Sequence, residues 1–187
     1  SKKEATSQVG VVTGLAYTEF GGDILPIEVN AFEGKDSLIL TGNLGQVMKE
    51  SASIGLDYVK SNAKKYGIDP TFFENHAIHI HVPEGAVPKD GPSAGIALTT
   101  CIISCLTNKK AKSPVAMTGE VNLRGQALPI GGLKEKSLAA CRSGIKTIIV
   151  PRGNEKDVVD LPEEVKKNVE VILMDNVDDA LKITLEN

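Results

Sequence analysis

The stretch Gly91-Pro92-Ser93-Ala94-Gly95 leads into a run of almost uninterrupted apolar residues that extends to Leu106. A helix that is apolar on all sides is buried inside a core, so residues 93–106 are expected to form the central helix of one domain. The same five residues read G-x-S-x-G, a pattern that presents a serine hydroxyl at a sharp turn. The sequence therefore places a candidate nucleophile, Ser93, at the start of its most buried helix.

The segments around this helix predict a mixed domain, because strand patterns come first and strands and helices then alternate. Strands are expected over residues 10–18, 24–32, 37–41, 76–82, 115–117, 120–130, 146–150 and 171–174, with a turn at 21–23. Helices are expected over 46–66, 93–106, 133–142 and 177–185, with one or two short helices between 154 and 169. The fold class is thus α/β (mixed α+β), in a single compact domain with small mixed sheets.

Composition sets further bounds. A chain of 187 residues with 41% hydrophobic and 24% charged residues can bury the core of one soluble domain. The net charge of −3 gives no electrostatic reason to expect a nucleic acid or an anionic membrane as partner. Three cysteines, two of them in the apolar run, favour free thiols in a reducing compartment. No apolar run approaches the roughly 18 residues of a membrane span. The polar residues 1–8 are interpreted as the remnant of a linker, and 9–187 as the domain.

A serine hydroxyl needs a base to become a nucleophile, and the usual base is histidine. The three histidines, at positions 76, 79 and 81, all precede Ser93. An α/β-hydrolase needs a strand running into the serine and a histidine after it, and neither is present. His81, Asp90 and Ser93 do follow the chymotrypsin order, but they are confined to thirteen positions. The remaining base with precedent is lysine.

A lysine base must be neutral, which requires burial to lower its pKa from about 10.4 to the range of about 7–8. Residues 129–140 provide such surroundings, since two lysines open a helix built mainly of leucine and alanine. These lysines are Lys134 and Lys136. Helical periodicity alone does not choose between them.

Four segments of the chain resemble the proteolytic domain of the ATP-dependent Lon protease family, in the same order. They are HIHVPEGA at 79–86, PKDGPSAG at 88–95, MTGEVNLRG at 117–125 and PIGGLKEK at 129–136. The form of the serine motif is similar to the A-type, soluble branch. The resemblance covers nearly the whole chain.

This resemblance implies that Ser93 is the nucleophile and that Lys136, the second lysine of GLKEK, is the catalytic base. It also implies that the Thr118 hydroxyl holds the lysine in place. Asp90, Gly91 and Pro92 form the supporting turn, and Pro92 suits the first turn of the helix that carries Ser93. Asp90 is expected to cap that helix, and a role in restraining the dyad is an equal alternative. Free N–H groups at that helix end would then form the oxyanion hole.

The resemblance further implies a protein-degrading machine for unfolded or damaged proteins and peptides, acting in protein quality control. The chain has no GxxxxGK[ST] phosphate loop, so ATP and Mg²⁺ are expected to bind to an ATPase module outside it. The chain itself is expected to need no cofactor or metal and to have no nucleic-acid or membrane site. A homohexameric ring is implied, in a bacterial cytoplasm or an organelle matrix such as the mitochondrial one.

Several alternatives stay open from sequence alone. A non-catalytic scaffold could keep this fold, and an esterase-type serine hydrolase would share the serine turn. His79 and His81 share a strand face, so they are either a two-histidine metal site without an evident third ligand or residues with a structural or site-lining role. Glu120 is either a substrate contact or an exposed turn carboxylate.

Overall fold

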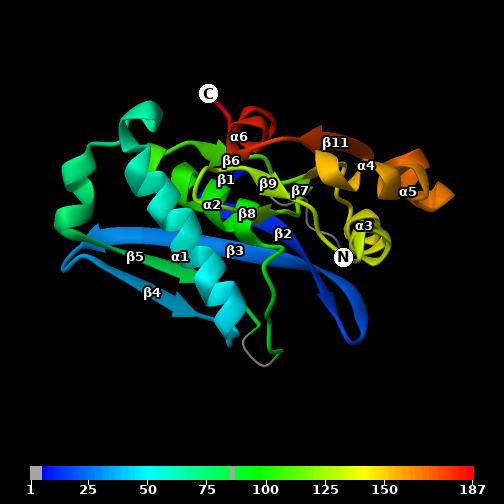
Figure 1. Ribbon diagram of the computed structural model, residues 1–187, viewed down its shortest axis with the longest axis horizontal. Coiled ribbons are helices and arrows are strands. Elements are labelled where there is room, and N and C mark those ends of the chain that lie inside the picture. Colours follow the sequence, from blue (N-terminus) through cyan, green and yellow to red (C-terminus); the bar gives the residue numbers. More distant parts are fainter. Residues whose placement is uncertain (1–5, 85–86) are drawn as a thin grey trace.

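The computed structural model describes residues 6–84 and 87–187. Of the segment interpreted as a linker remnant, residues 1–5 lie outside the described residues. Gln8, from the same segment, belongs to a short strand, β1 (Gln8–Val9), which pairs antiparallel with β6 (Lys110–Ala111). The described chain forms one mixed α/β unit around a seven-stranded sheet (Figure 1).

The sheet has the strand order β11-β10-β7-β2-β3-β5-β4. Its strands are β2 (Val11–Thr18), β3 (Gly21–Glu33), β4 (Ser37–Thr41), β5 (His76–His81), β7 (Val115–Met117), β10 (Thr147–Pro151) and β11 (Glu170–Met174). The long β2–β3 hairpin lies in the middle and is antiparallel. On one side of it β7, β10 and β11 pair in parallel, and on the other side β5 pairs antiparallel with β3 and parallel with β4. The sheet is therefore mixed.

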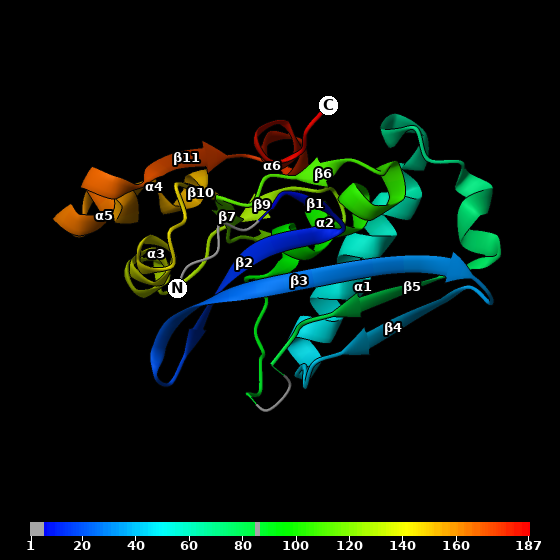
Figure 2. The ribbon, with the colours of Figure 1, turned by 180° about the vertical axis from the view of Figure 1, so that it is seen from behind.

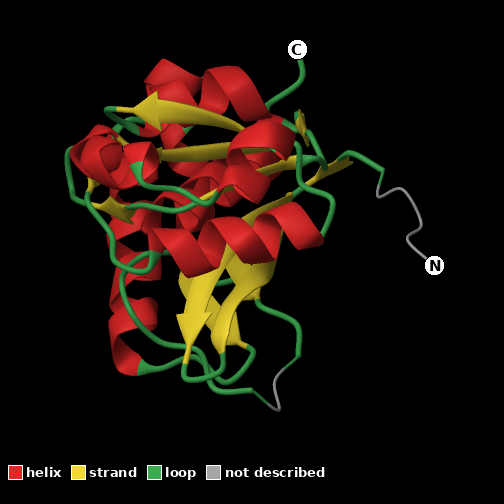
Figure 3. Ribbon diagram, turned by 90° about the vertical axis from the view of Figure 1, so that its right-hand side faces the viewer, coloured by secondary structure: helices red, strands yellow, loops and turns green. Residues whose placement is uncertain are grey.

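Helices bury both faces of the sheet at its parallel end. Along β10, Ile149 belongs to the core around α2 (Gly95–Thr107), whereas Ile148 and Val150 belong to the core around α3 (Leu133–Arg142). Because successive side chains of a strand point to opposite faces, this split means that α2 and α3 lie on opposite sides of the sheet. Figure 3 shows this layering of helices and strands from the side.

The remaining helices surround these two. α1 (Gln46–Ser61) and α6 (Val177–Thr184) pack on α2, and α4 (Glu155–Val159) and α5 (Glu163–Asn168) pack on α3. Short 3-10 turns are η1 (Ala63–Tyr66), η2 (Pro70–Glu74) and η3 (Arg152–Asn154). None of the helices in the described part of the chain has the length and apolarity needed to cross a bilayer.

The expected element order is confirmed, with local differences that have physical causes. The single helix expected over 46–66 ends at Ser61, because the Asn62 side chain donates to the Tyr58 carbonyl and its backbone leaves the helical region at φ −118°. The turn expected at 21–23 lies at residues 19–20 instead, and Gly21 begins β3. The strand expected over 120–130 is a hairpin of β8 (Glu120–Val121) and β9 (Ala127–Leu128), which pair antiparallel.

Candidate active site

Ser93 lies in the turn immediately before α2, which begins at Gly95 rather than at the serine. The Ser93 carbonyl accepts a hydrogen bond from the Gly119 amide at 2.8 Å, and the Gly119 carbonyl accepts one from the Ile96 amide at 3.0 Å. Gly91 has φ +102°, a backbone conformation that favours glycine, and this residue turns the chain just before Ser93. The serine is thus fixed between α2 and the segment that follows β7.

A cavity of about 670 Å³, here called the cleft, brings Ser93 and Lys136 together. Its lining residues come from β2, from the serine turn and from the segment that opens α3: Tyr17, Asp90, Gly91, Pro92, Ser93, Pro129, Ile130, Gly131, Gly132, Glu135 and Lys136. The two candidate catalytic residues stand far apart in sequence and on opposite sides of the sheet. The cleft is the place where their two layers meet.

Lys136 is 2% exposed, which is rare for a lysine without an acidic partner. Burial lowers the pKa of its amine from the ordinary 10.5 to about 8. No salt bridge to this lysine occurs among the described residues. The lowered pKa corresponds to a cost of about 3 kcal/mol for keeping the ammonium form in this site. The site therefore favours the neutral amine, which is the form that can accept a proton.

Thr118 is fully buried and contacts both residues. Its hydroxyl accepts a hydrogen bond from the Lys136 amine at 3.3 Å and donates one to the Ser93 carbonyl at 3.4 Å. Its backbone amide donates to the Ile149 carbonyl of β10 at 3.1 Å, which fixes the residue to the sheet. Within the described residues, Lys136 donates to Thr118 and makes no hydrogen bond to the Ser93 hydroxyl. Bonds between catalytic groups are often long or absent before substrate binds.

Asp90 caps a helix, but the expectation that it caps the helix of Ser93 is wrong. Its carboxylate accepts from the Met48 amide in the first turn of α1 at 3.0 Å, whereas α2, whose N-cap residue is Ala94, has no side-chain cap among the described residues. The N-cap of α1 is Gly45, where a Cβ would lie 2.2 Å from the Asp90 Cγ. The missing side chain leaves room for Asp90 to serve as the cap. Hydrogen bonds from the Gly91 and Met48 amides lower the pKa of the Asp90 carboxyl.

Just before α2, the backbone offers two donors that have no acceptor in the part of the protein that the structure describes. The Gly95 amide donates to the Pro92 carbonyl and the Ile96 amide to Gly119. The amides of Ser93 and Ala94 have no hydrogen-bond acceptor within residues 6–84 and 87–187. Unpaired N–H groups at the beginning of a helix attract negative charge. They are therefore available to an anionic oxygen at the serine.

The contacts of His79 and His81 fit the structural alternative. His79 Nε2 and His81 Nδ1 both contact the Thr41 hydroxyl, at 2.9 and 2.6 Å, and neither lines the cleft. Asp90 and Ser93 both line the cleft, but His81 does not, so the three residues do not form a catalytic triad. No group of three potential metal ligands occurs in the part of the chain that the structure describes.

Two other candidates also lie outside the cleft. Lys134 is exposed, and it lines a neighbouring cavity rather than the one that contains Ser93. The structure thus separates the two lysines that periodicity left equivalent. Glu120, in β8, is half-buried and does not line the cleft. Conversely, Tyr17 lines the cleft without having been anticipated, because its position in a strand carries no local sign of its distant neighbours.

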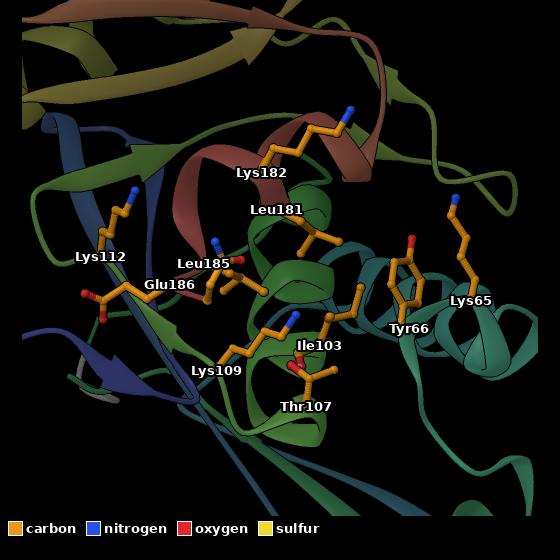
Figure 4. Close-up of a pocket in the computed structure, with 11 residues that line it drawn as sticks. Lys65, Tyr66, Ile103, Thr107, Lys109, Lys112, Leu181, Lys182, Leu185 and Glu186 are labelled. Carbon is orange, nitrogen blue, oxygen red and sulfur yellow. The ribbon is translucent and has the colours of Figure 1, made fainter.

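A second cavity of about 670 Å³ lies at the opposite end of α2 (Figure 4). Four lysines surround it, Lys65, Lys109, Lys112 and Lys182, above an apolar floor that includes Leu181 and Leu185. Its one threonine, Thr107, donates its hydroxyl to the carbonyl of Ile103 at 2.6 Å. This cavity pairs no nucleophile with a buried base, so the hydrolytic chemistry is expected at the Ser93 cleft.

Fold and cleft together define the class of the molecule: a mixed α/β domain with a serine before a buried helix and a buried lysine in the same cavity. A family model described as the Lon protease (S16) C-terminal proteolytic domain matches residues 1–187, and the chain belongs to this family. It is 57% identical over 187 residues to a Lon protease of Mycoplasma mycoides subsp. mycoides SC. It is 58% identical over 182 residues to one of Chloroflexus aggregans, and 56% identical over 182 residues to Lon protease 1 of Bacillus subtilis.

The matches cover 97–100% of this chain but only 22–24% of the relatives. The chain therefore spans about a quarter of the length of the curated relatives it matches.

Proposed function

We propose that this chain is a serine endopeptidase domain in which Ser93 is the nucleophile and Lys136 the base. The observation that carries the proposal is the burial of Lys136, at 2% exposure, in the cleft that Ser93 also lines. Within residues 6–84 and 87–187 this lysine has no acidic partner. A lysine amine buried in this way lowers the stability of the fold. A serine protease with a lysine base needs such burial, because it keeps the amine neutral and able to accept the serine proton. Membership of the proteolytic-domain family supports the same reaction.

The reaction is acyl transfer to the serine and then to water. Neutral Lys136 takes the proton of the Ser93 hydroxyl as the oxygen attacks a peptide carbonyl, and the resulting ammonium protonates the departing amine. The same lysine then takes a proton from the water that hydrolyses the acyl-enzyme. Thr118 keeps the amine in place during both steps, through the 3.3 Å hydrogen bond.

The negative oxygen of the tetrahedral intermediate would be stabilised by the amides of Ser93 and Ala94. These donors are preorganised, because the turn is fixed by the Ser93–Gly119 and Ile96–Gly119 backbone bonds. Preorganised donors of this kind contribute a large part of the rate enhancement in acyl transfer. The pKa of about 8 leaves about a tenth of the Lys136 amine neutral at pH 7, against fewer than one in a thousand at the ordinary value.

The remainder of the assignment concerns the full-length protein. We propose that an ATPase module elsewhere in the protein uses ATP and Mg²⁺ and delivers unfolded or damaged proteins, as part of protein quality control. We also propose a homohexameric ring, in a bacterial-type cytoplasm or an organelle matrix, and no cofactor for the chain itself. Relatives about four times as long support a larger machine. Sedimentation of the full-length protein as a monomer at high concentration would remove the ring.

The test is cleavage of fluorogenic peptides, of an ester and of a folded protein by the wild-type chain and by Ser93→Ala. We expect hydrolysis of the peptides without nucleotide, no cleavage of the folded protein, and complete loss of activity in Ser93→Ala. A serine-reactive peptide boronate should bind to the wild type and not to the variant. A well-folded wild type that hydrolyses neither substrate would favour a scaffold, and hydrolysis of the ester alone an esterase.

A further inference from the structure

Residues 129–136 form one wall of the cleft and carry Lys136 at their end. Two other parts of the fold hold this segment from opposite sides. In Figures 1 and 2, α3 lies between the tip of the β2–β3 hairpin and the α4 region. The contacts on each side involve backbone atoms of the segment itself, and each depends on one residue.

On the hairpin side the residue is Gly22, at the start of β3. A Cβ built on Gly22 would lie 2.1 Å from the Glu135 carbonyl oxygen and 2.8 Å from the Lys136 nitrogen. Side-chain carbons do not approach backbone atoms this closely, so only glycine permits the contact. The backbone of β3 therefore touches the backbone of α3 at the residue that carries the proposed base.

On the other side the residue is Asn154, in η3, which is 2% exposed. Its Oδ1 accepts from the Ile130 amide at 3.0 Å, and its Nδ2 donates to the Ile130 carbonyl at 2.8 Å. The second Nδ2 proton goes to the Asp157 carboxylate, also at 2.8 Å. One side chain thus satisfies both polar backbone groups of a residue in the cleft wall, and its own donors are fully used.

We propose that Gly22 and Asn154 are positioning residues that hold segment 129–136 so that Lys136 stays buried beside Thr118 and Ser93. This inference rests on the proposed peptidase function. Neither residue lines the cleft, so both act through the segment that they hold. Small displacements suffice, because an ångström of movement at a catalytic group costs orders of magnitude in rate.

A displaced α3 has a specific signature. Moving the helix away from the hairpin admits water to Lys136, and burial is the cause that lowers the pKa of its amine. The pKa then rises toward its ordinary value, so the catalytic rate falls at neutral pH and recovers only at higher pH. The other titratable groups that face the cleft are Tyr17, Asp90 and Glu135, and all three stay in place in the variants below.

The experiment uses Gly22→Ala and Asn154→Leu in the 187-residue chain. Matched controls are Gly34→Ala, where a Cβ meets nothing closer than 3.8 Å, and Asn62→Leu, which removes an amide that bonds a backbone carbonyl away from the cleft. For each variant we measure kcat and KM against pH, the thermal midpoint, and the Lys136 pKa by NMR with ¹³C-labelled lysine. The NMR measurement does not depend on catalysis.

We expect Gly22→Ala and Asn154→Leu to lower kcat at least tenfold at pH 7.5 and to move the acid limb and the NMR pKa upward by at least half a pH unit. In the two control variants, the pH profile of kcat and the NMR pKa of Lys136 should stay at their wild-type values, even where the thermal midpoint changes. Wild-type pH profiles and NMR pKa values in the folded test variants would overturn the proposal, and so would a failure of both to fold, since that would give them a global role. If only one of the two test variants fails to fold, the pH profile and NMR pKa of the other variant test the proposal.

The same data separate this inference from the proposed function. Should Lys136→Ala retain wild-type turnover, the dyad fails, while the NMR pKa still reports whether Gly22 and Asn154 keep Lys136 buried. Should Lys136→Ala be inactive and the NMR pKa of the test variants stay unchanged, the dyad stands and the positioning role fails.

Discussion

The Lys136 amine donates a hydrogen bond to Thr118 Oγ1 at 3.3 Å, and the same hydroxyl donates to the Ser93 carbonyl. Both side chains are buried, so the pair links the two candidate catalytic residues without contact with solvent. Lys136 belongs to α3 and Ser93 to the turn before α2, and these two helices lie on opposite faces of the sheet. Thr118, at the end of β7, connects them through the sheet itself.

Replacing Thr118 with valine keeps the volume of the side chain and removes the hydroxyl. We expect kcat to fall about 10- to 100-fold with KM little changed, because the lysine loses the group that orients it. Steady-state kinetics on a fluorogenic peptide measure both constants. Thr118→Ser retains the hydroxyl and should recover most of kcat; a serine variant as slow as the valine variant would mean that packing, not the hydrogen bond, is what matters.

The pH dependence of kcat/KM should follow the deprotonation of the Lys136 amine. Only neutral Lys136 can accept the serine proton, so activity rises as pH increases through about 8, where burial places its pKa. The measurement is kcat/KM from pH 6 to 10 at constant ionic strength. The rise of kcat/KM with pH (the acid limb of the profile) should persist in His79→Gln and His81→Gln, because both histidines contact Thr41 and lie outside the cleft. Loss of the limb in either variant would assign it to a histidine.

Lys136→Met should inactivate the protein and stabilise it. The folded pKa of about 8 lies below the ordinary 10.5, so between these values the unfolded chain binds more protons and stability rises with pH. Below pH 8 the buried amine lowers the free energy of unfolding by about 3 kcal/mol, and methionine at this position removes that loss. We expect a gain of about 1–3 kcal/mol at pH 7, or roughly 3–10 °C in the thermal midpoint. The gain should shrink toward pH 10.5.

The control for that substitution is Lys134→Met, on the same turn of α3. Its side chain is exposed, so no burial cost is there to relieve. Thermal unfolding followed at pH 7 and pH 10 distinguishes the two variants. An equal gain in both, or a gain for Lys136→Met that does not depend on pH, would show that the charge of Lys136 is not what destabilises the fold.

Asp90→Ala should loosen the start of α1 and leave that of α2 intact. The carboxylate accepts from the Met48 amide, and its pKa is lowered by that bond and by the Gly91 amide. Its stabilising effect is therefore present above the unfolded pKa of 3.8 and is lost as pH falls through the lower folded value. Hydrogen exchange should accelerate at Met48 and not at Ile96. Asp90→Asn keeps an acceptor and should restore protection.

Much of the fold follows from local sequence patterns. The alternation of the strands and the apolar run of α2 predicted the elements and their order, and the bounds of α3 agree residue for residue with those expected. The misplaced boundaries share one cause. Asn62 ends α1 through a side-chain bond to the Tyr58 carbonyl, and Gly22 belongs to β3 at a point where the Glu135 carbonyl of α3 leaves no room for a side chain. Both boundaries depend on contacts with other residues, which the hydrophobic periodicity of the sequence does not reveal.

In the candidate site too, some residues were predictable from sequence motifs and others depend on contacts between distant segments. Ser93, Thr118 and Lys136 were anticipated from the family resemblance. Helical periodicity alone left Lys134 and Lys136 equivalent, and the tertiary structure separates them by burying Lys136 and exposing Lys134. The cap formed by Asp90 on α1 bridges 42 positions. Asn154 carried no signal at all, since the Ile130 backbone groups it satisfies lie 24 positions away.

Peptide hydrolysis at pH 8 by Lys136→Ala and by Lys134→Ala tests whether Lys136 is the catalytic base. Both variants lose one amine from the same turn of α3, but only Lys136 shares the cleft with Ser93. We expect kcat/KM to fall at least a thousandfold in Lys136→Ala and to stay within about threefold of wild type in Lys134→Ala. Lys136→Ala activity close to that of the wild type would contradict this role of Lys136.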